Sequence, residues 1–408
     1  MTSTSLQTSS QTYIQTGLLA QEEKLEMGKL KKILTIGIPC ETKSHENRIP
    51  LTPLGVMQLV KSGHHVIVET KVGSGAKFSD LDYSEAGAII VQNKADVFKC
   101  DIIVKIAPLT LEEVDYLRQD QAVFSFLCMP TLSEELMRSL LLKKTTAISL
   151  ELLTDNENVR PVVRAMNEIS GSVSIMIAAE YLSTVHGGKG VLLGGFTGIT
   201  PVEIVIIGAG TASEFAARTA LGLGATVKVF DQSIHKLRAL KHSLGQNIFT
   251  SIIQPQVLAK TLQSADVVIG ATEQFDDRLT YFVSEDMVRK MKHGSVIIDL
   301  DIEQGSVFET SKPTSHSLPV FSKFGVIHYC VTNVPSRVAR TASIALSDIL
   351  VPIFDKIGQI GGIRQQLGVD PGLRKGAYVF KGILTNNIIG NRLGIPSNDI
   401  DLLMPMFE

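Results

Sequence analysis

A glycine-rich turn in the second half of the chain has the residue types and spacing of a dinucleotide-binding site. The apolar run Ile204–Ile207 predicts a buried strand, and it leads directly into a short glycine-containing segment. The first glycine permits a tight turn, and the second has no side chain, so the backbone can approach a pyrophosphate. A helix that begins there presents free N–H groups and the positive end of its dipole to the phosphates. The predicted cofactor contacts are Gly208, Gly210, Thr211, Ala212 and Ser213, with the serine in place of the usual third glycine.

An acidic residue at the end of the next predicted strand strengthens this interpretation. The strand Thr226–Phe230 leads into Asp231, which lies 21 residues beyond Gly210. A carboxylate at about this spacing accepts the ribose hydroxyls of the cofactor. Because its charge would repel a 2′-phosphate, Asp231 favours NAD over NADP. The alternative is an ordinary glycine turn in an α/β domain, with Asp231 solvated.

The composition indicates a globular protein and excludes several classes of partner. The chain has 408 residues, which suits two domains, with 44% hydrophobic and 20% charged residues and a net charge of −2. No basic field is present to hold nucleic acid or an anionic membrane surface. No apolar run is long and unbroken enough for a membrane helix, and residues 1–32 lack the apolar core of a signal peptide.

The cysteines favour a reduced compartment. None of the four forms a C-x-x-C pair, and no histidine cluster lies near them at zinc spacing, so we expect no metal site. Together with the missing signal peptide, this predicts a cytoplasmic protein. The four residues are Cys40, Cys100, Cys128 and Cys330.

Two series of strands alternating with helices position these residues. Such alternation predicts parallel βαβ units, and apolar runs without alternation indicate sheets that are covered on both faces. The first series comprises Leu34–Ile38, Val66–Glu69, Ile102–Ile106, Val123–Leu127 and Ala147–Leu150, with helices over Pro53–Ser62 and Glu112–Arg118 among them. The second series comprises Ile204–Ile207, Thr226–Phe230, Ala265–Gly270, Val296–Leu300 and Val326–Cys330. A longer helix over Met166–Tyr181 lies between the series, and another, containing Pro352, follows Arg340.

From residue 33 to about residue 400, the chain resembles the alanine dehydrogenases and the related NAD-binding component of transhydrogenase. The similarity rests on several motifs that recur in order and at similar spacing, and it is closer to the alanine dehydrogenases. The motifs are Gly37-Ile38-Pro39, Glu41-Thr42-Lys43, Glu46-Asn47-Arg48, Leu51-Thr52-Pro53, Gly187–Gly195, the glycine turn, Gly294–Asp299 and His328–Pro335.

The resemblance implies an α/β fold of two Rossmann-like domains, each with a doubly wound parallel sheet. The nucleotide domain is inserted into the substrate domain, and NAD and an amino acid bind in the cleft between them. We therefore expect an extension over 1–32, a substrate domain over 33–161 and 341–408, and an NAD-binding domain over 162–340. Members of the family are commonly homo-hexamers, so a homo-oligomer is expected.

The resemblance also implies positions for catalytic residues, and this sequence departs from the family at three of them. Arg48 occupies the position that anchors the substrate carboxylate, a task that suits the planar fork of an arginine. The lysine that binds substrate is replaced by Ala107, the catalytic histidine by Cys128, and the aspartate on the nicotinamide side by Glu303. Removing a general acid or base typically slows a reaction by ~10²–10⁴-fold.

Four residues are candidates for the remaining catalytic or ligand-binding roles. Glu303 follows the carboxyl end of a Rossmann strand, where ligands bind, and it is the best surviving candidate for the base. It shares strand parity with Asp299 and Asp301 if the strand extends that far. Lys105 is a weaker candidate for the missing lysine, and Cys128, with apolar neighbours, is more readily explained as a structural thiol. Asn333 is a candidate contact to the ribose or the substrate, with a turn residue as the alternative.

Several functions remain open at this point. The first is an NAD-dependent L-alanine dehydrogenase that forms pyruvate and ammonia. The second is an NAD(H)-binding component of a transhydrogenase, which also lacks the lysine and the histidine. The third is a dehydrogenase of another amino acid or an opine-like substrate, because Ala107 enlarges the pocket and removes a cation. A fourth is an NAD sensor without catalytic activity.

Overall fold

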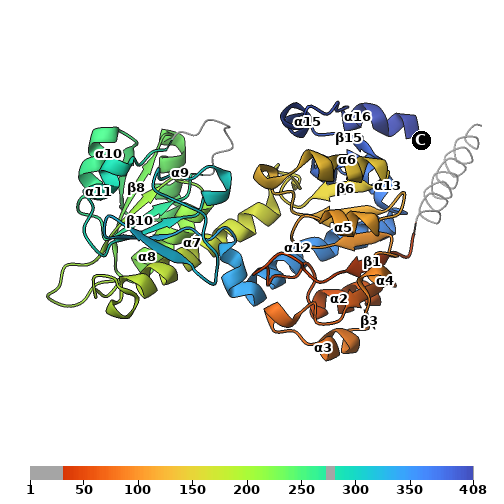
Figure 1. The fold of residues 1–408 in the computed structure, drawn as a ribbon, viewed down its shortest axis with the longest axis horizontal. Coiled ribbons are helices and arrows are strands. Elements are labelled where there is room, and N and C mark those ends of the chain that lie inside the picture. The colour runs from red at the N-terminus through yellow and green to blue at the C-terminus, as the bar shows by residue number, and fades with distance from the viewer. Residues whose placement is uncertain (1–30, 273–280, 408) are drawn as a thin grey trace, which may run out of the picture.

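The chain forms two α/β lobes, each built around its own mostly parallel sheet (Figure 1). This computed structural model describes residues 31–272 and 281–407. The predicted N-terminal extension, residues 1–32, therefore lies almost wholly outside the described residues.

The first sheet has eight strands in the order β15-β14-β6-β5-β4-β1-β2-β3. Its six strands from the first part of the chain run parallel to one another, whereas β14 pairs antiparallel with β6 and β15 antiparallel with β14. The C-terminal part of the chain thus returns to complete this sheet. The strands are β1 (Thr35–Ile38), β2 (His65–Glu69), β3 (Ile89–Val91), β4 (Ile102–Val104), β5 (Ala122–Ser125), β6 (Thr146–Ser149), β14 (Ala377–Phe380) and β15 (Ile383–Leu384).

The second sheet has seven strands in the order β12-β13-β11-β10-β7-β8-β9. All are parallel except the edge strand β12, which pairs antiparallel with β13. The chain leaves the middle of the sheet at β7 and crosses outward in both directions, which is the doubly wound arrangement. The strands are β7 (Glu203–Ile207), β8 (Thr226–Asp231), β9 (Phe249–Ile252), β10 (Val267–Gly270), β11 (Val296–Asp299), β12 (Val320–Lys323) and β13 (Val326–Tyr329).

Two long helices join the lobes, α7 (Pro161–Leu182) on the way out and α12 (Ala339–Gln359) on the way back (Figure 1). Helix α7 begins with a proline at its first position, where the missing N–H leaves no bond unmade. It packs closely on α8, since a Cβ at Gly171 would lie 2.1 Å from the carbonyl oxygen of Ala212. Helix α12 continues through Pro352 and buries its apolar side in the first lobe.

The remaining helices cover the faces and edges of the two sheets. In the first lobe they are α2 (Pro53–Lys61), α3 (Asp80–Glu85), α4 (Lys94–Val97), α5 (Leu111–Asp115), α6 (Glu134–Leu142), α13 (Ile363–Val369), α14 (Pro371–Gly376), α15 (Asn387–Leu393) and α16 (Ile400–Leu403). In the second lobe they are α8 (Thr211–Gly222), α9 (Ile234–Leu244), α10 (Pro255–Leu262) and α11 (Glu285–Arg289). The 3₁₀ turns are η1 (Ser74–Ala76), η2 (Met129–Thr131), η3 (Thr184–His186), η4 (Ile302–Gln304), η5 (Val334–Val338) and η6 (Met404–Phe407).

The predicted α/β fold with two parallel-sheet lobes is confirmed, and each strand predicted in the two series is present within one or two residues. The strand that leads to Asp299 does not extend as far as Glu303. Strand β11 ends at Asp299, and Glu303 lies on the turn η4 rather than on an extended strand. The strand stops there because the buried Asp299 carboxylate accepts hydrogen bonds from the turn, from the Ser306 hydroxyl at 2.5 Å and the Asp301 amide at 3.2 Å.

Candidate functional site

The carboxyl ends of the parallel strands bring the predicted site residues to one edge of each sheet. In the second lobe, Gly208 follows β7, Asp231 ends β8 and Glu303 follows β11. In the first lobe, Arg48 lies on the loop after β1 and Cys128 follows β5. Ligands of doubly wound sheets bind at this edge, so both lobes present their candidate groups where a shared site is expected.

The glycine turn has the backbone shape that the sequence predicts. Gly208 has φ of +114°, and a Cβ there would lie 1.9 Å from the carbonyl oxygen of Ala271, so only glycine fits. Gly210 is the N-cap of α8, and Thr211 is the first residue of that helix. The buried Ser213 hydroxyl donates to the same Ala271 carbonyl at 3.1 Å, which explains how a serine replaces the third glycine.

Asp231 is turned toward this glycine turn. Its Oδ2 accepts from the Ala209 amide at 2.7 Å, and its Oδ1 accepts from the Ser233 amide at 2.7 Å. Each carboxylate oxygen has lone pairs to spare after one such bond. The carboxylate is thus held at the end of β8, where it can accept two hydroxyls of a ribose.

Arg48 is a buried cation with a dedicated partner. Its Nε donates to Glu46 Oε1 at 2.7 Å, and its Nη2 donates to Glu46 Oε2 at 2.6 Å. The guanidinium lies 5.4 Å from the centre of the Phe126 ring, and its Nη1 faces the Met166 sulfur at 3.5 Å. Burial works against the charge, but Glu46 outweighs it and raises the pKa of Arg48. One edge of the fork is fixed by Glu46. On the other edge, among the described residues, Nη1 donates only to the Met166 thioether, a weak acceptor that a carboxylate would displace.

Glu303 faces the first lobe. Its Oε1 lies 4.0 Å from Lys43 Nζ, an ion pair that crosses from one lobe to the other. The Glu303 side chain is 43% exposed. Its partial burial raises the pKa of this carboxyl above its ordinary value, against the opposing effects of Lys43 and Arg48. A carboxyl with a raised pKa next to two cations has the properties of a general acid or base.

Cys128 and Glu151 lie beside these charges on the first lobe. Cys128 has a left-handed backbone (φ of 48°), and its amide and that of Leu127 donate to Glu151 Oε2 at 3.3 and 2.9 Å. Burial, with the neighbouring Glu151 and Glu303 carboxylates, raises the pKa of the Cys128 thiol to about 12. The thiol is therefore protonated near neutral pH and is a poor base.

Lys105 does not take the catalytic place that the sequence suggested for it. Its side chain has no exposed surface, and its Nζ donates to Glu113 at 2.7 Å and lies 3.8 Å from Glu41. Glu41 Oε2, the oxygen nearest Lys105, also accepts from the Ala107 amide at 3.1 Å, and Oε1 accepts from the Ile106 amide at 2.5 Å. The Lys105 side chain therefore lies inside the first lobe, next to Glu113 and Glu41, and is not available to bind a substrate.

The Asn333 side chain forms a hydrogen bond between the two lobes. Its side-chain Nδ2 donates to the carbonyl oxygen of His45 at 3.1 Å, on the loop that carries Arg48. Its backbone carbonyl is bonded to His316 Nε2 at 3.2 Å. A role beside the ribose or substrate remains a prediction, since one Asn333 donor is already used within the protein.

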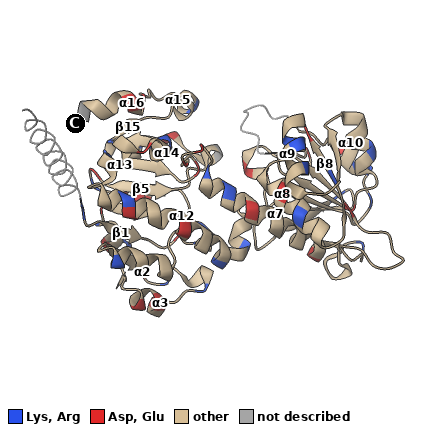
Figure 2. Cartoon of the chain, turned by 180° about the vertical axis from the view of Figure 1, so that it is seen from behind, with Lys and Arg blue, Asp and Glu red and all other residues tan. Residues whose placement is uncertain are grey.

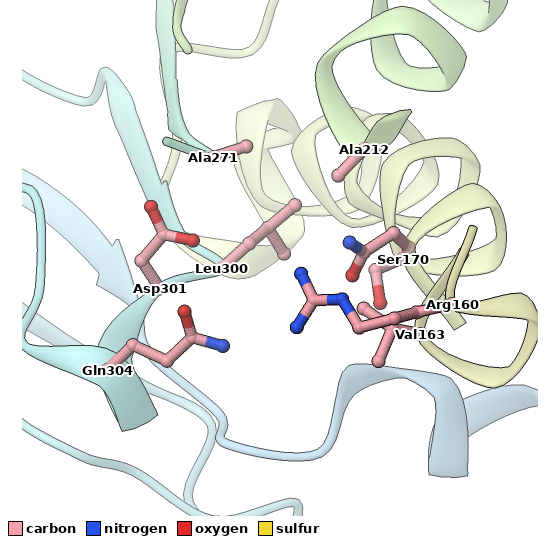
Figure 3. A pocket seen from close by; sticks show the side chains of 9 residues that line it. Arg160, Val163, Ser170, Ala212, Ala271, Leu300, Asp301 and Gln304 are labelled. Carbon is pink, nitrogen blue, oxygen red and sulfur yellow. The ribbon is translucent and has the colours of Figure 1, made fainter. Parts of the chain in front are cut away.

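A pocket where α7 meets the glycine turn contains residues that the sequence reasoning missed (Figure 3). Arg160 and Gln304 extend toward one another across it, and Asp301 accepts from the amide and hydroxyl of Thr272 at 2.5 and 2.7 Å. Asp301 follows a predicted strand, so the rule that drew attention to Glu303 also marks it. No motif marks Arg160, which precedes a helix. The pocket is lined by Arg160, Val163, Asn167, Ser170, Ala212, Ala271, Leu300, Asp301 and Gln304.

Lysine and arginine are interspersed with aspartate and glutamate over both lobes (Figure 2). In the described part of the chain, no cluster of His, Cys, Asp and Glu has the geometry to hold a metal ion. Over the same residues, no helix has the length and apolar character needed to cross a membrane.

Comparison with known proteins identifies the relatives of this chain. The family model described as "Alanine dehydrogenase/PNT, N-terminal domain" matches residues 37–170, and that described as "Alanine dehydrogenase/PNT, C-terminal domain" matches residues 174–387. This chain belongs to the alanine dehydrogenase/PNT family.

Individual relatives within the alanine dehydrogenase/PNT family support the same assignment. The alanine dehydrogenase of Staphylococcus saprophyticus is 37% identical over 369 residues, covering 90% of this chain and 99% of its own. Alanine dehydrogenase 2 of Staphylococcus aureus is 38% identical over 354 residues, covering 86% and 95%.

Solved structures of the family share the fold. An L-alanine dehydrogenase superposes with a TM-score of 0.83 at 35% identity, covering 88% of this chain and 98% of that one. A transhydrogenase from Sinorhizobium meliloti has a TM-score of 0.73 at 24% identity, covering 86% and 99%, and shows the fold alone. The chain is thus alanine dehydrogenase-like over nearly its whole described length.

Proposed function

We propose that this protein is an NAD-dependent dehydrogenase that converts L-alanine to pyruvate and ammonia. The observation that carries the proposal is the geometry of Arg48, a buried guanidinium with one edge fixed by Glu46. The remaining edge suits a carboxylate, the group that every α-amino acid presents. The membership in the alanine dehydrogenase/PNT family supports the choice of alanine.

The residues of the second lobe fit NAD as the cofactor. The approach of the backbone at Gly208 leaves no room for a side chain, and the start of α8 offers free amides to a pyrophosphate. Asp231 would hold the ribose and exclude a 2′-phosphate. When bound, NAD supplies the acceptor for the hydride that leaves Cα of the amino acid.

The protein side of the reaction needs a carboxylate anchor and a base. Loss of a hydride from Cα and of a proton from the amino group leaves an imine. Water adds to that imine, and the C–N bond then breaks to release ammonia. Arg48 orients the carboxylate through these steps, and Glu303 takes the proton from water and returns it to the departing nitrogen. Glu303 is supported in this role by its raised pKa and by its position on the second lobe, facing Lys43 of the first lobe.

One observation favours a second candidate, a dehydrogenase of a larger amino acid. Ala107 is buried on the loop after β4, and it offers neither a charge nor a long side chain. A family lysine at this place would contribute a cation to the substrate, and an alanine there would leave more room for a substrate side chain. The side chain of a bulkier substrate would fill that space.

A substrate panel distinguishes the two candidates. Purified protein is mixed with NAD and each of the common L-amino acids, and reduced nicotinamide is followed by absorbance. Turnover with alanine above all others supports the proposed function, and turnover with a larger amino acid supports the second. NADH binding measured by calorimetry, with no turnover on any amino acid, would exclude both.

A further inference from the structure

The loop that carries Arg48 is hydrogen-bonded to the segment that leaves the second sheet. The carbonyl oxygen of His45 accepts from Ser336 Oγ at 2.7 Å and from Asn333 Nδ2 at 3.1 Å. Ser336 Oγ in turn accepts from the Asn47 amide at 2.9 Å. One buried hydroxyl therefore bonds the loop on both sides of Glu46, the residue that fixes the guanidinium.

A third attachment joins the same loop to a different part of the second lobe. The His45 side chain is hydrogen-bonded through Nε2 to the Ser317 hydroxyl at 2.7 Å. His45 has a positive φ of 63°, an unfavourable backbone conformation for a residue with a side chain. The bonds to Ser336 and Asn333 hold its carbonyl in that conformation. They act together with the turn bond from the Glu46 amide to the carbonyl oxygen of Lys43 at 3.2 Å, which closes the loop around His45.

The segment that holds the loop, residues 333–336, lies near the proposed NAD site in the second lobe. Ser336 and Asn333 follow β13, which pairs with β11, and the turn after β11 carries Glu303 and Asp301. The segment is folded as the turn η5, with Ser336 buried, and a cofactor seated against the ends of these strands would press on it. A shift of the segment would then be passed through Ser336 to the loop and, through Glu46, to Arg48.

We infer that Ser336 is a positioning residue that couples occupation of the nucleotide pocket to the placement of Arg48. The inference rests on the proposed function, because it assumes that NADH and a carboxylate bind at these two places. It predicts that NADH strengthens binding of a carboxylate substrate, and that the strengthening depends on the Ser336 hydroxyl. By thermodynamic linkage, pyruvate must strengthen NADH binding by the same factor.

The test measures this coupling by calorimetry in wild-type protein and in Ser336→Ala. Pyruvate is titrated with and without saturating NADH, in the absence of ammonia so that reductive amination is blocked. Ser343→Ala is the matched control. The hydroxyl of Ser343 accepts from the Ile49 amide at 2.9 Å, as that of Ser336 does from Asn47, but Ser343 lies on α12 within the first lobe.

We expect NADH to tighten pyruvate binding about tenfold in the wild-type protein, a typical size for such coupling. In Ser336→Ala the factor should fall toward one, while the affinity for NADH alone stays unchanged. Ser343→Ala should keep the wild-type factor. Equal coupling in wild type and Ser336→Ala, or no coupling in wild type, would overturn the inference. A wild-type protein that binds no NADH would instead contradict the proposed function. Failure of the coupling and failure of the proposed function therefore give different results.

Discussion

Glu46 holds Arg48 through two parallel hydrogen bonds of 2.7 and 2.6 Å, in a place where both side chains are almost completely buried. A pair of this kind orients the guanidinium, and it also makes each partner depend on the other. Removing the arginine leaves a buried carboxylate without its counter-ion, which typically destabilises a protein by about 3–5 kcal/mol. Function and stability must therefore be separated when Arg48 is tested.

Arg48→Ala should abolish turnover and leave NADH binding nearly unchanged. Each hydrogen bond from a charged donor contributes about 1.5–3 kcal/mol, so losing two of them to the substrate should lower kcat/KM at least ~100-fold. Steady-state kinetics and NADH calorimetry are compared on the same preparation. Glu46→Gln combined with Arg48→Ala should recover most of the lost stability and none of the turnover. Equal loss of NADH binding and turnover would contradict a substrate-anchoring role.

Glu303→Gln should slow alanine oxidation by about 10²–10⁴-fold, the usual contribution of a general acid–base group. The base must be ionised to take a proton, so the rate should fall as the pH falls through the pKa of Glu303. Burial raises that pKa, which places the acidic limb of the rate profile above the range of an ordinary glutamate. The profile of kcat/KM against pH is measured for wild type, Glu303→Gln and Glu303→Asp.

Glu303→Asp keeps a carboxylate and restores the residue of the family pattern. It should retain an acidic limb, whereas Glu303→Gln should lose it. An unchanged pH profile in Glu303→Gln would show that the titrating group lies elsewhere.

Asp231→Asn should weaken NADH binding about 10–100-fold, because hydrogen bonds to a charged group are worth about 1.5–3 kcal/mol. Removing the negative charge should also remove its repulsion of the 2′-phosphate of NADPH. The ratio of the NADH affinity to the NADPH affinity should therefore be smaller than in the wild type. Calorimetric titrations with both nucleotides measure this ratio. Asp286→Asn on α11, where the carboxylate is exposed, is the control and should leave both affinities unchanged. A preserved ratio in Asp231→Asn would contradict a ribose contact.

A structural feature of this protein can be predicted from the sequence when the residues that determine it are close together in the chain. The buried parallel strands and the glycine turn are marked by apolar runs and by glycines that their backbone geometry requires, and both are where the sequence predicts them. The strands β3, β9, β12, β14 and β15 were not predicted. They are short or lie at the sheet edges, where apolar runs are weak and pairing partners are distant in sequence.

The candidate site could be predicted only in part, because several of its side-chain contacts are not marked by any sequence pattern. Glu46 lies two residues from Arg48 in a loop, and no periodicity indicates that the two side chains pair. The partner of Lys105 is Glu113, on a helix that follows the strand, and this contact decides that the lysine is turned away from the site. Asn333 could be marked from its motif, but its bond to His45 spans 288 residues of sequence.

Glu41 should give this protein an unusual pH dependence of stability. Burial raises the pKa of its carboxyl from 4.5 to about 7 in the folded state, in spite of the nearby Lys105. The folded state then keeps a proton that the unfolded chain releases, so its stability falls as the pH rises between those two values. The slope from this one group is at most ~1.4 kcal/mol per pH unit.

The contribution is isolated by comparing wild type with Glu41→Gln, which stays neutral and keeps an oxygen to accept the Ile106 amide. Free energies of unfolding are measured in urea between about pH 5 and about pH 8, the range in which the raised pKa acts. Relative to Glu41→Gln, the wild type should lose stability up to about pH 7, with no further loss above it. Glu112→Gln, an exposed carboxylate on α5, should track the wild type throughout. A wild-type-to-Gln difference that does not vary with pH would show that Glu41 is ionised in the folded protein over the whole range.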